Sequence, residues 1–203
     1  QKAEEKAEDS LDLNWLAYSV ALAIDDKDWA KKIYRKAEGY AESSLDLNWL
    51  AYSVFEALGD KEWAKQLFGK AESENIRELC DLAESVSEIL EDKEWQLKIY
   101  KKAEEHAKEY SDFYELADNV FAKLGDGEWA SYLYHKAEDR AEDCCDLLSL
   151  AESFIEKLGD GEGARRLYEK AEKNAEDSMD FGVISESLRE ILGDKEWALR
   201  LSP

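Results

Sequence analysis

Proline is almost absent from this sequence, since the single proline, Pro203, is the last of 203 residues. Glycine is also scarce, with ten residues. A β-rich fold of this length needs many more turn-forming residues, whereas Ala, Leu, Glu and Lys, which dominate the chain, favour helices. Hydrophobic residues make up 44 %, including seven Trp and ten Tyr, which is enough to bury a core. The composition therefore predicts an all-α fold.

Positive charge is in short supply, with 27 basic against 49 acidic residues and a formal net charge of −22. Such an excess repels phosphate backbones and anionic lipids, so we expect neither nucleic acid nor membrane as a partner. No run of apolar residues approaches the length of a membrane-spanning helix. The charge is consistent with a solvated helical surface or with recruitment of a basic partner, and both readings stay open.

Residues that carry chemistry are few. The cysteines, Cys80, Cys144 and Cys145, form neither an even-numbered disulfide framework nor a Cys-x-x-Cys pair. The histidines, His106 and His135, are 29 residues apart and lack a metal-ligand spacing. Phosphate-binding glycine loops, EF-hand loops and nucleophile elbows are missing from the sequence. We therefore expect no catalytic residue, no cofactor and no metal, hence not an enzyme.

The compartment is predicted from the same residues. Reduced thiols fit a cytosol-like environment, and the first five residues do not resemble a signal peptide. The expected location is cytoplasmic.

An internal repeat decides the predicted architecture. The tripeptide Lys-Ala-Glu recurs in steps of 34, 34, 32, 34 and 34 residues, and the ten residues from Leu11 to Val20 reappear unchanged from Leu45 to Val54. A Trp follows an acidic turn in five of the six copies, and Gly163 takes its place in copy five. We interpret this Trp series as structural packing. The tripeptide begins at Lys2, Lys36, Lys70, Lys102, Lys136 and Lys170.

Each copy is predicted to form two helices. The first carries apolar residues at i, i+3, i+4 and i+7, such as Leu47, Leu50, Ala51 and Val54, and its third residue is small in every copy. A Gly-Asp pair then predicts a tight turn, because Gly ends a helix and Asp caps the next. Copies one and three have Asp25 and Glu91 instead of the Gly, which predicts slight strain there.

This pattern resembles the tetratricopeptide repeat, which is also a 34-residue helix hairpin. Ala64, Phe68 and Ala71 have the small–aromatic–small spacing of that family, although no copy ends in the usual proline. The resemblance implies an α-solenoid of six tandem repeats with a right-handed superhelix, as one domain over residues 1–203 with a period of about 34 and one copy of 32. The shorter copy is expected to lose its two residues between Ala71 and Leu79.

The resemblance also implies a concave groove lined by the first helices. The residues at its groove positions are candidates for partner binding: Asn14, Tyr18, Asn48, Tyr52, Phe55, Tyr114, Asp118 and Phe121. The alternative is that Tyr18 and Tyr52 pack against the neighbouring unit and that the repeated Asn–Tyr pair reflects duplication alone.

Two functions follow as hypotheses. The first is a non-catalytic scaffold that binds a protein or peptide in the groove, with a basic partner favoured by the charge. The second is a structural or self-assembly module, natural or engineered. Residues 2–8 resemble the latter half of a second helix and residues 195–201 the first half. These two half-helices would belong to a longer array, or the end of one chain would complete the start of the next chain.

Overall fold

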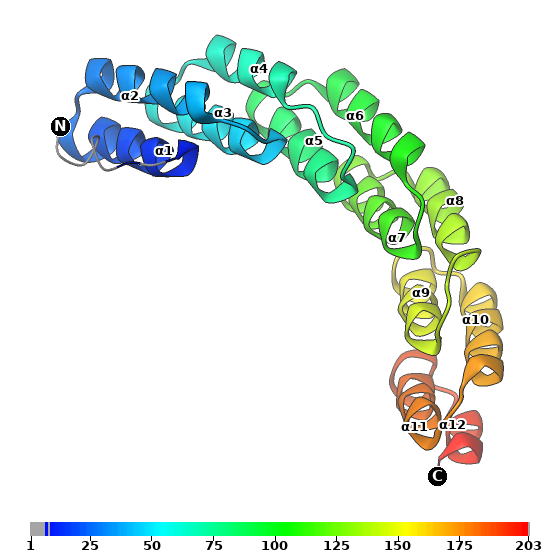
Figure 1. The fold of residues 1–203 in the computed structure, drawn as a ribbon. Coiled ribbons are helices and arrows are strands. Elements are labelled where there is room, and N and C mark those ends of the chain that lie inside the picture. Colours follow the sequence, from blue (N-terminus) through cyan, green and yellow to red (C-terminus); the bar gives the residue numbers. More distant parts are fainter. Residues whose placement is uncertain (1–6, 8, 203) are drawn as a thin grey trace. The chain divides into compact units, whose positions relative to one another are not determined.

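The computed structural model describes residues 7 and 9–202, and over these residues the chain is all-helical. Twelve α-helices and three short π-helical segments follow one another as antiparallel pairs, without a strand among the described residues (Figure 1). The prediction of an all-α fold is confirmed. The repeat marker at Lys2 lies outside the described residues.

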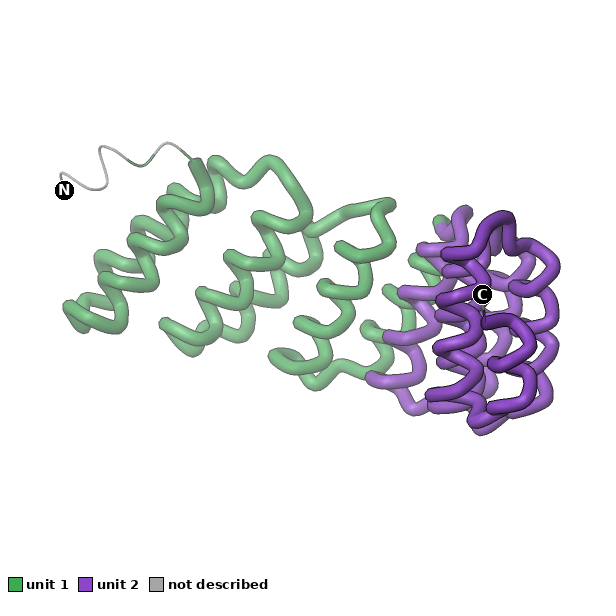
Figure 2. Tube along the Cα trace, turned by 90° about the horizontal axis from the view of Figure 1, so that it is seen from below, with its two compact units in different colours: residues 1–106 green, residues 107–203 purple. Residues whose placement is uncertain are grey.

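Two units make up the chain, Gln1–His106 (unit 1) and Ala107–Pro203 (unit 2), each with three hairpins (Figure 2). The single domain expected over residues 1–203 stays a prediction. Unit 1 contains α1 (Ser10–Ser19) with its π-helical end (Val20–Ile24), α2 (Lys27–Tyr40), α3 (Ser44–Leu58), α4 (Lys61–Lys70), α5 (Ile76–Leu90) and α6 (Lys93–His106). Unit 2 contains α7 (Tyr110–Asn119) with a π-helical end (Val120–Leu124), α8 (Gly127–Glu138), α9 (Cys144–Glu156), α10 (Gly161–Asn174), α11 (Ser178–Ser187) with a π-helical end (Leu188–Leu192), and α12 (Lys195–Leu201).

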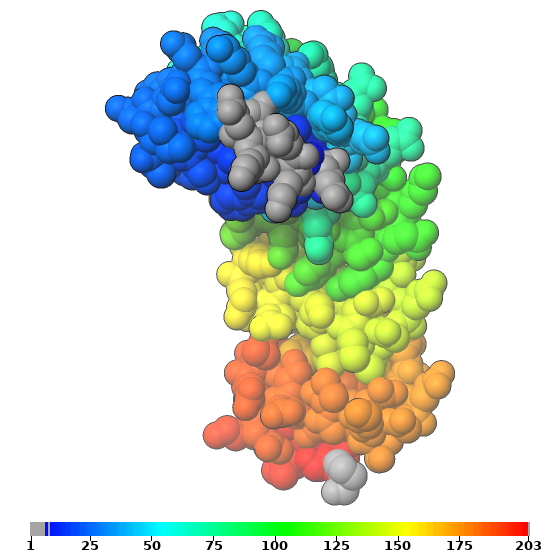
Figure 3. Space-filling view, turned by 60° about the vertical axis from the view of Figure 1, so that its left-hand side comes forward, coloured from blue at the N-terminus to red at the C-terminus, as the bar shows by residue number. Residues whose placement is uncertain are grey.

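Successive hairpins pack against each other within each unit. In unit 1, α3 contacts both α1 and α5, and in unit 2, α9 contacts both α8 and α11. The surface of unit 2 accordingly shows its hairpins as bands that follow the colour order of the sequence (Figure 3). The first helices of neighbouring hairpins in unit 1 therefore lie side by side.

The turns inside the hairpins have the predicted chemistry. Four of them place a Gly in the left-handed region, with φ between 66° and 74°, while Asp25 and Glu91 take the same conformation with φ of 60° and 58°. A non-glycine residue is disfavoured there because its Cβ crowds the backbone. The following Asp caps the next helix by accepting a backbone N–H bond three residues on, and the six caps are Asp26, Asp60, Asp92, Asp126, Asp160 and Asp194.

The predicted core positions are buried, apart from Leu16, Leu47 and Phe181, which are half-buried. The small residue of each first helix is at most 4 % exposed, which allows the second helix to approach closely. Each large side chain that is fully buried contributes about 1.5–3 kcal/mol. The small residues are Ala17, Ala51, Ala83, Ala117, Ala151 and Ser185.

The shorter copy loses length where the sequence predicts it. Helix α4 ends at Lys70 after ten residues, four fewer than the fourteen of α2, and α5 begins at Ile76. The core pattern then resumes at Leu79, which is buried.

The predicted structural role of the Trp series is confirmed for Trp63 and Trp197. Trp63 packs edge-on against Tyr34 of the preceding hairpin, with ring centroids 6.3 Å apart, and its indole N–H donates to Glu38 at 3.1 Å. Trp197 repeats both contacts in unit 2, with Tyr168 and Glu172. The Trp residues at positions 29, 95 and 129 are only half-buried.

Copy five replaces this Trp by Gly163 for a steric reason. A Cβ atom at position 163 would lie 2.6 Å from Cδ1 of Phe154 and 2.3 Å from Oδ2 of Asp160. Phe154 stands where copy two has Val54, so a larger side chain on the first helix occupies space next to the missing indole. Phe154 also takes over the contact with the preceding hairpin, since its ring centroid lies 6.3 Å from that of Tyr134.

Candidate functional site

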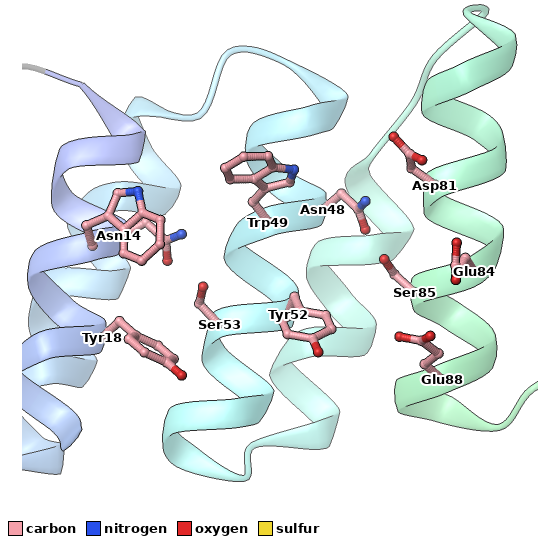
Figure 4. Close-up of a pocket in the computed structure, with 11 residues that line it drawn as sticks. Asn14, Tyr18, Asn48, Trp49, Tyr52, Ser53, Asp81, Glu84, Ser85 and Glu88 are labelled. Carbon is pink, nitrogen blue, oxygen red and sulfur yellow. The ribbon is translucent and has the colours of Figure 1, made fainter.

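A groove of about 560 Å³ lies on the face of unit 1 that α1, α3 and α5 share (Figure 4). Residues four apart on a helix point to the same side, and this spacing brings Asn14 and Tyr18 from α1 into the groove. Asn48 and Tyr52 enter from α3 in the same way. The eleven residues that line the groove are Asn14, Trp15, Tyr18, Asn48, Trp49, Tyr52, Ser53, Asp81, Glu84, Ser85 and Glu88.

Two asparagines combine deep burial with an unused acceptor. Asn14 and Asn48 are 5 % and 6 % exposed, and within the described residues the Oδ1 atom of neither has a hydrogen-bond partner. Leaving a buried acceptor unsatisfied costs about 1–3 kcal/mol, so such groups call for an explanation. Both residues line the groove, and their Oδ1 atoms lie buried beneath its surface.

Aromatic side chains form much of the groove surface. Trp15, Trp49 and Tyr52 are 59 %, 47 % and 44 % exposed, and Tyr18 is half-buried beside Trp15 with ring centroids 6.4 Å apart. Exposed aromatic area of this kind is typical of binding surfaces because it offers large contact area at low entropic cost.

Helix α5 lines the groove with acidic side chains. It contributes Asp81, Glu84 and Glu88, and none of the eleven lining residues is Lys or Arg. Ser85 and Glu88 point towards Tyr52 of α3 (Figure 4). Charges of one sign in a concave site attract the opposite charge, so the groove favours a cationic ligand.

The sequence-based candidates separate into three groups. Asn14, Tyr18, Asn48 and Tyr52 line the groove together, and Phe55 is half-buried on α3 without lining it. Tyr114, Asp118 and Phe121 belong to unit 2, where all three are half-buried.

Sequence reasoning did not name Trp15, Trp49, Asp81 or Glu88 as groove residues. A usable signal was available for the two Trp residues. They directly follow the repeated Asn, and first helices carry Trp only in copies one and two. No comparable sequence signal marks the acidic residues of α5, because carboxylates occur on every helix surface.

A polar network surrounds Asp118 in unit 2. Lys157, directly after α9, donates to Oδ1 of Asp118 at 2.5 Å, and the hydroxyl of Tyr134 donates to the same oxygen. The ammonium lies 5.7 Å from the ring centroids of both Tyr114 and Tyr134. The Tyr114 hydroxyl is 3.0 Å from Oγ of Ser153. Burial, together with the bond to Asp118, raises the pKa of Tyr134 above its usual range.

No protein-family model matches the chain, and no curated protein matches it in sequence. In the part of the chain that the structure describes, no helix combines the length and apolarity needed to cross a membrane. Within residues 7 and 9–202, no three His, Cys, Asp or Glu side chains gather closely enough to hold a metal ion.

Proposed function

We propose that the chain is a non-catalytic scaffold that binds an extended segment of a protein or peptide in the groove of unit 1. The observation that carries this proposal is that two residues lining the groove, Asn14 and Asn48, each hold a buried Oδ1 atom without a partner among the described residues. Their 34-residue spacing places them on neighbouring first helices.

The chemistry of the groove suits a polypeptide backbone. An asparagine carbonyl accepts from a backbone N–H, and its amide can donate to a backbone carbonyl. The aromatic residues supply apolar contact area beside these polar groups, and the volume falls within the range of about 300–1,000 Å³ that ligand sites occupy.

We also propose that the six hairpins form one tetratricopeptide-like α-solenoid, as the sequence resemblance implies, and that the protein acts in the cytoplasm. The recurrence of the same turns, caps and Trp–Tyr contacts in both units supports a single repeat type.

A double variant, Asn14→Leu/Asn48→Leu, tests the binding function. Peptides that bind the full chain are first selected from a displayed random library, and their affinities are then measured by calorimetry. Leucine removes the unsatisfied oxygens at similar volume, so we expect the free energy of unfolding to rise by about 1 kcal/mol. Peptide affinity should fall by about thirtyfold or more.

The matched control is Tyr132→Ala, which removes an exposed aromatic side chain of α8 outside the groove. It should leave peptide affinity unchanged. The proposal is wrong if the library yields no binder, or if the leucine double variant binds the selected peptides as tightly as the wild-type chain.

Head-to-tail self-association is a second candidate function, and exposed apolar residues on the last hairpin favour it. Met179 and Val183, four residues apart on α11, are 71 % and 42 % exposed, and Leu199 on α12 is 69 % exposed. A second copy of the chain would cover them. Light scattering over a wide concentration range tests this, with Val183→Glu/Leu199→Glu as the variant expected to stay monomeric. A wild-type chain that is monomeric throughout rules it out.

A further inference from the structure

Two equivalent pairs of aromatic side chains line the groove of unit 1. Trp15 and Tyr18 are three residues apart on α1, and their rings meet edge-on. Trp49 and Tyr52 hold the same positions on α3, one repeat of 34 residues later. Residues three apart lie on one face of a helix, so each pair presents its rings together. The groove therefore offers the same aromatic pair twice, once on each of two neighbouring helices.

The distance between the two pairs selects a ligand conformation. Helices α1 and α3 pack against each other, and the axes of packed helices are about 8–10 Å apart. A polyproline II helix repeats every three residues, which is about 9 Å along its axis. In a β-strand, side chains that face the same way are about 7 or 13 Å apart. Among extended conformations, polyproline II therefore places successive equivalent side chains on the two pairs.

The same aromatic side chains carry hydrogen-bond donors, since each indole has an N–H group and each tyrosine a hydroxyl. Trp15, Trp49 and Tyr52 are exposed, and no described residue accepts a hydrogen bond from their side chains. A polyproline II segment has no internal hydrogen bonds, and each proline has a carbonyl but no N–H group. The donors of the groove therefore match the carbonyls that such a segment presents.

A smaller pocket of about 90 Å³ adjoins the groove between α1 and α3. Its apolar wall includes Leu11 and Leu45, which are again equivalent residues of copies one and two. Trp49 lines both this pocket and the groove, so its indole stands where the two hollows meet. Aromatic-lined grooves of this kind accept proline-rich segments.

We propose that the groove binds a proline-rich segment in the polyproline II conformation, with prolines three residues apart on the two aromatic pairs. This specificity rests on the proposed peptide-binding function. Such a segment is largely ordered before it binds, which lowers the entropic cost of binding. Neither the groove nor the smaller pocket is lined by Lys or Arg, and the chain has a charge of −22. The partner it selects therefore carries basic residues beside its prolines.

Binding of two blocked peptides of identical composition to the full chain tests this specificity. Both contain three prolines and six alanines with a lysine at each end, and they differ only in whether the prolines are three or four residues apart. Dissociation constants come from NMR titration with ¹⁵N-labelled protein. We expect the peptide with the three-residue spacing to shift resonances of α1 and α3 and to bind about tenfold more tightly than the other.

The variant Trp15→Leu/Trp49→Leu keeps apolar side chains but removes both indoles, and it should reduce this advantage to about twofold or less. Its matched control, Val183→Leu, places a leucine at the same repeat position of unit 2 and should preserve the full advantage. Tyr52→Phe keeps the ring and removes a donor, so it should weaken binding about threefold. Replacing the terminal lysines of the peptide by glutamates should weaken binding about tenfold at low salt, and added salt should reduce this difference.

The outcomes separate this inference from the binding function itself. Equal binding of both peptides in the groove overturns recognition of the proline spacing and leaves peptide binding intact. Tighter binding of the four-residue spacing, or of the peptide with terminal glutamates, also overturns it. Failure of the three-residue peptide to shift groove resonances overturns it as well, and the library selection with the Asn14→Leu/Asn48→Leu variant then decides whether the groove binds peptides at all.

Discussion

Units 1 and 2 are built from the same type of hairpin, but the surfaces of their first helices carry different side chains. In unit 1, Asn14 and Asn48 line an open groove with acceptors that no described residue satisfies. In unit 2, Asp118 is engaged by Lys157 and Tyr134. The comparison teaches that the repeat supplies a scaffold, while side chains particular to each copy decide whether its surface stays open or is occupied by the chain itself.

The turns of the two units differ as well. All three turns of unit 2 have a glycine in the left-handed conformation, whereas two of the three in unit 1 use Asp25 and Glu91. Unit 1 therefore combines unsatisfied polar groups with strained turns. Both features lower the stability of unit 1, and the unsatisfied polar groups are useful only if a ligand binds.

The largest effect is expected from exchanging the packing of copy five for that of copy two. Gly163→Trp alone should destabilise the chain by about 3 kcal/mol, because the new side chain collides with Phe154. Adding Phe154→Val recreates the pair Val54 and Trp63 of unit 1 and should recover most of the loss. Urea unfolding of the wild type, the two single variants and the double variant measures the coupling free energy between positions 154 and 163. Simply additive effects would show that positions 154 and 163 do not compete for the same space.

Lys157→Met removes the internal cation of unit 2. Loss of its charged hydrogen bond to Asp118 should cost about 1.5 kcal/mol, and the effect should shrink at high salt. Lys173→Met, at an exposed position on α10, is the control for the charge change. Urea unfolding measures the loss, and a loss no larger than that of the control would show that the ion pair with Asp118 does not stabilise the fold.

Glu38→Gln tests the junction between the first two hairpins of unit 1. Burial alone would raise the pKa of Glu38, but hydrogen bonds from Lys70, Trp63 and Arg35 hold it below its usual range. A lowered pKa stabilises the fold above the pKa of the unfolded chain, and this contribution disappears as the pH falls through the folded pKa.

The Glu38 variant should therefore be less stable than the wild type by about 1 kcal/mol at neutral pH. The difference should diminish as the pH falls below the usual range of a glutamate carboxyl and the Glu38 carboxylate becomes protonated. Thermal unfolding at several pH values measures it, and a difference that does not change with pH would exclude a contribution from the carboxylate charge.

The smallest effect is expected from giving unit 1 the turn glycines of unit 2. Glu91→Gly should stabilise the chain by about 0.5 kcal/mol, because relief of the left-handed strain exceeds the entropic cost of glycine. Asp25→Gly should gain less, since Asp tolerates this conformation better than Glu. Hydrogen exchange should locate the gain in unit 1, and a loss of stability in either variant would show that the turn is not strained.

Much of the fold was predictable because its determinants are local. The helix pairs follow from the spacing of residues such as Leu50, Ala51 and Val54, and the turns follow from the Gly-Asp signal. The π-helical ends were not predictable from the shared segment. Leu11–Val20 and Leu45–Val54 are identical, yet only the first is followed by a π-helical turn.

The candidate site was predictable only in part. The repeated Asn–Tyr pair identified four groove residues in unit 1. The same transfer of positions also predicted that Tyr114 and Asp118 bind a partner. In the structure both residues belong to a polar network with Lys157. Lys157 is 39 residues from Asp118, and the same separation joins Glu84 and Lys123 one repeat earlier, a sequence signal that the transfer of groove positions did not use.

The sequence by itself determined the helical class, the hairpin unit, its turn and its buried positions, because these depend on spacing within one helix or one turn. Only the tertiary structure decided which side chains of neighbouring hairpins meet. In the tertiary structure the oxygens of Asn14 and Asn48 have no partner among the described residues, and the ammonium of Lys157 lies against Asp118. The ring of Phe154 lies close to position 163, where copy five has a glycine instead of the Trp. The physical reason is that such contacts join residues brought together by packing between helices, where a single change of size or charge alters the outcome without disturbing the repeat.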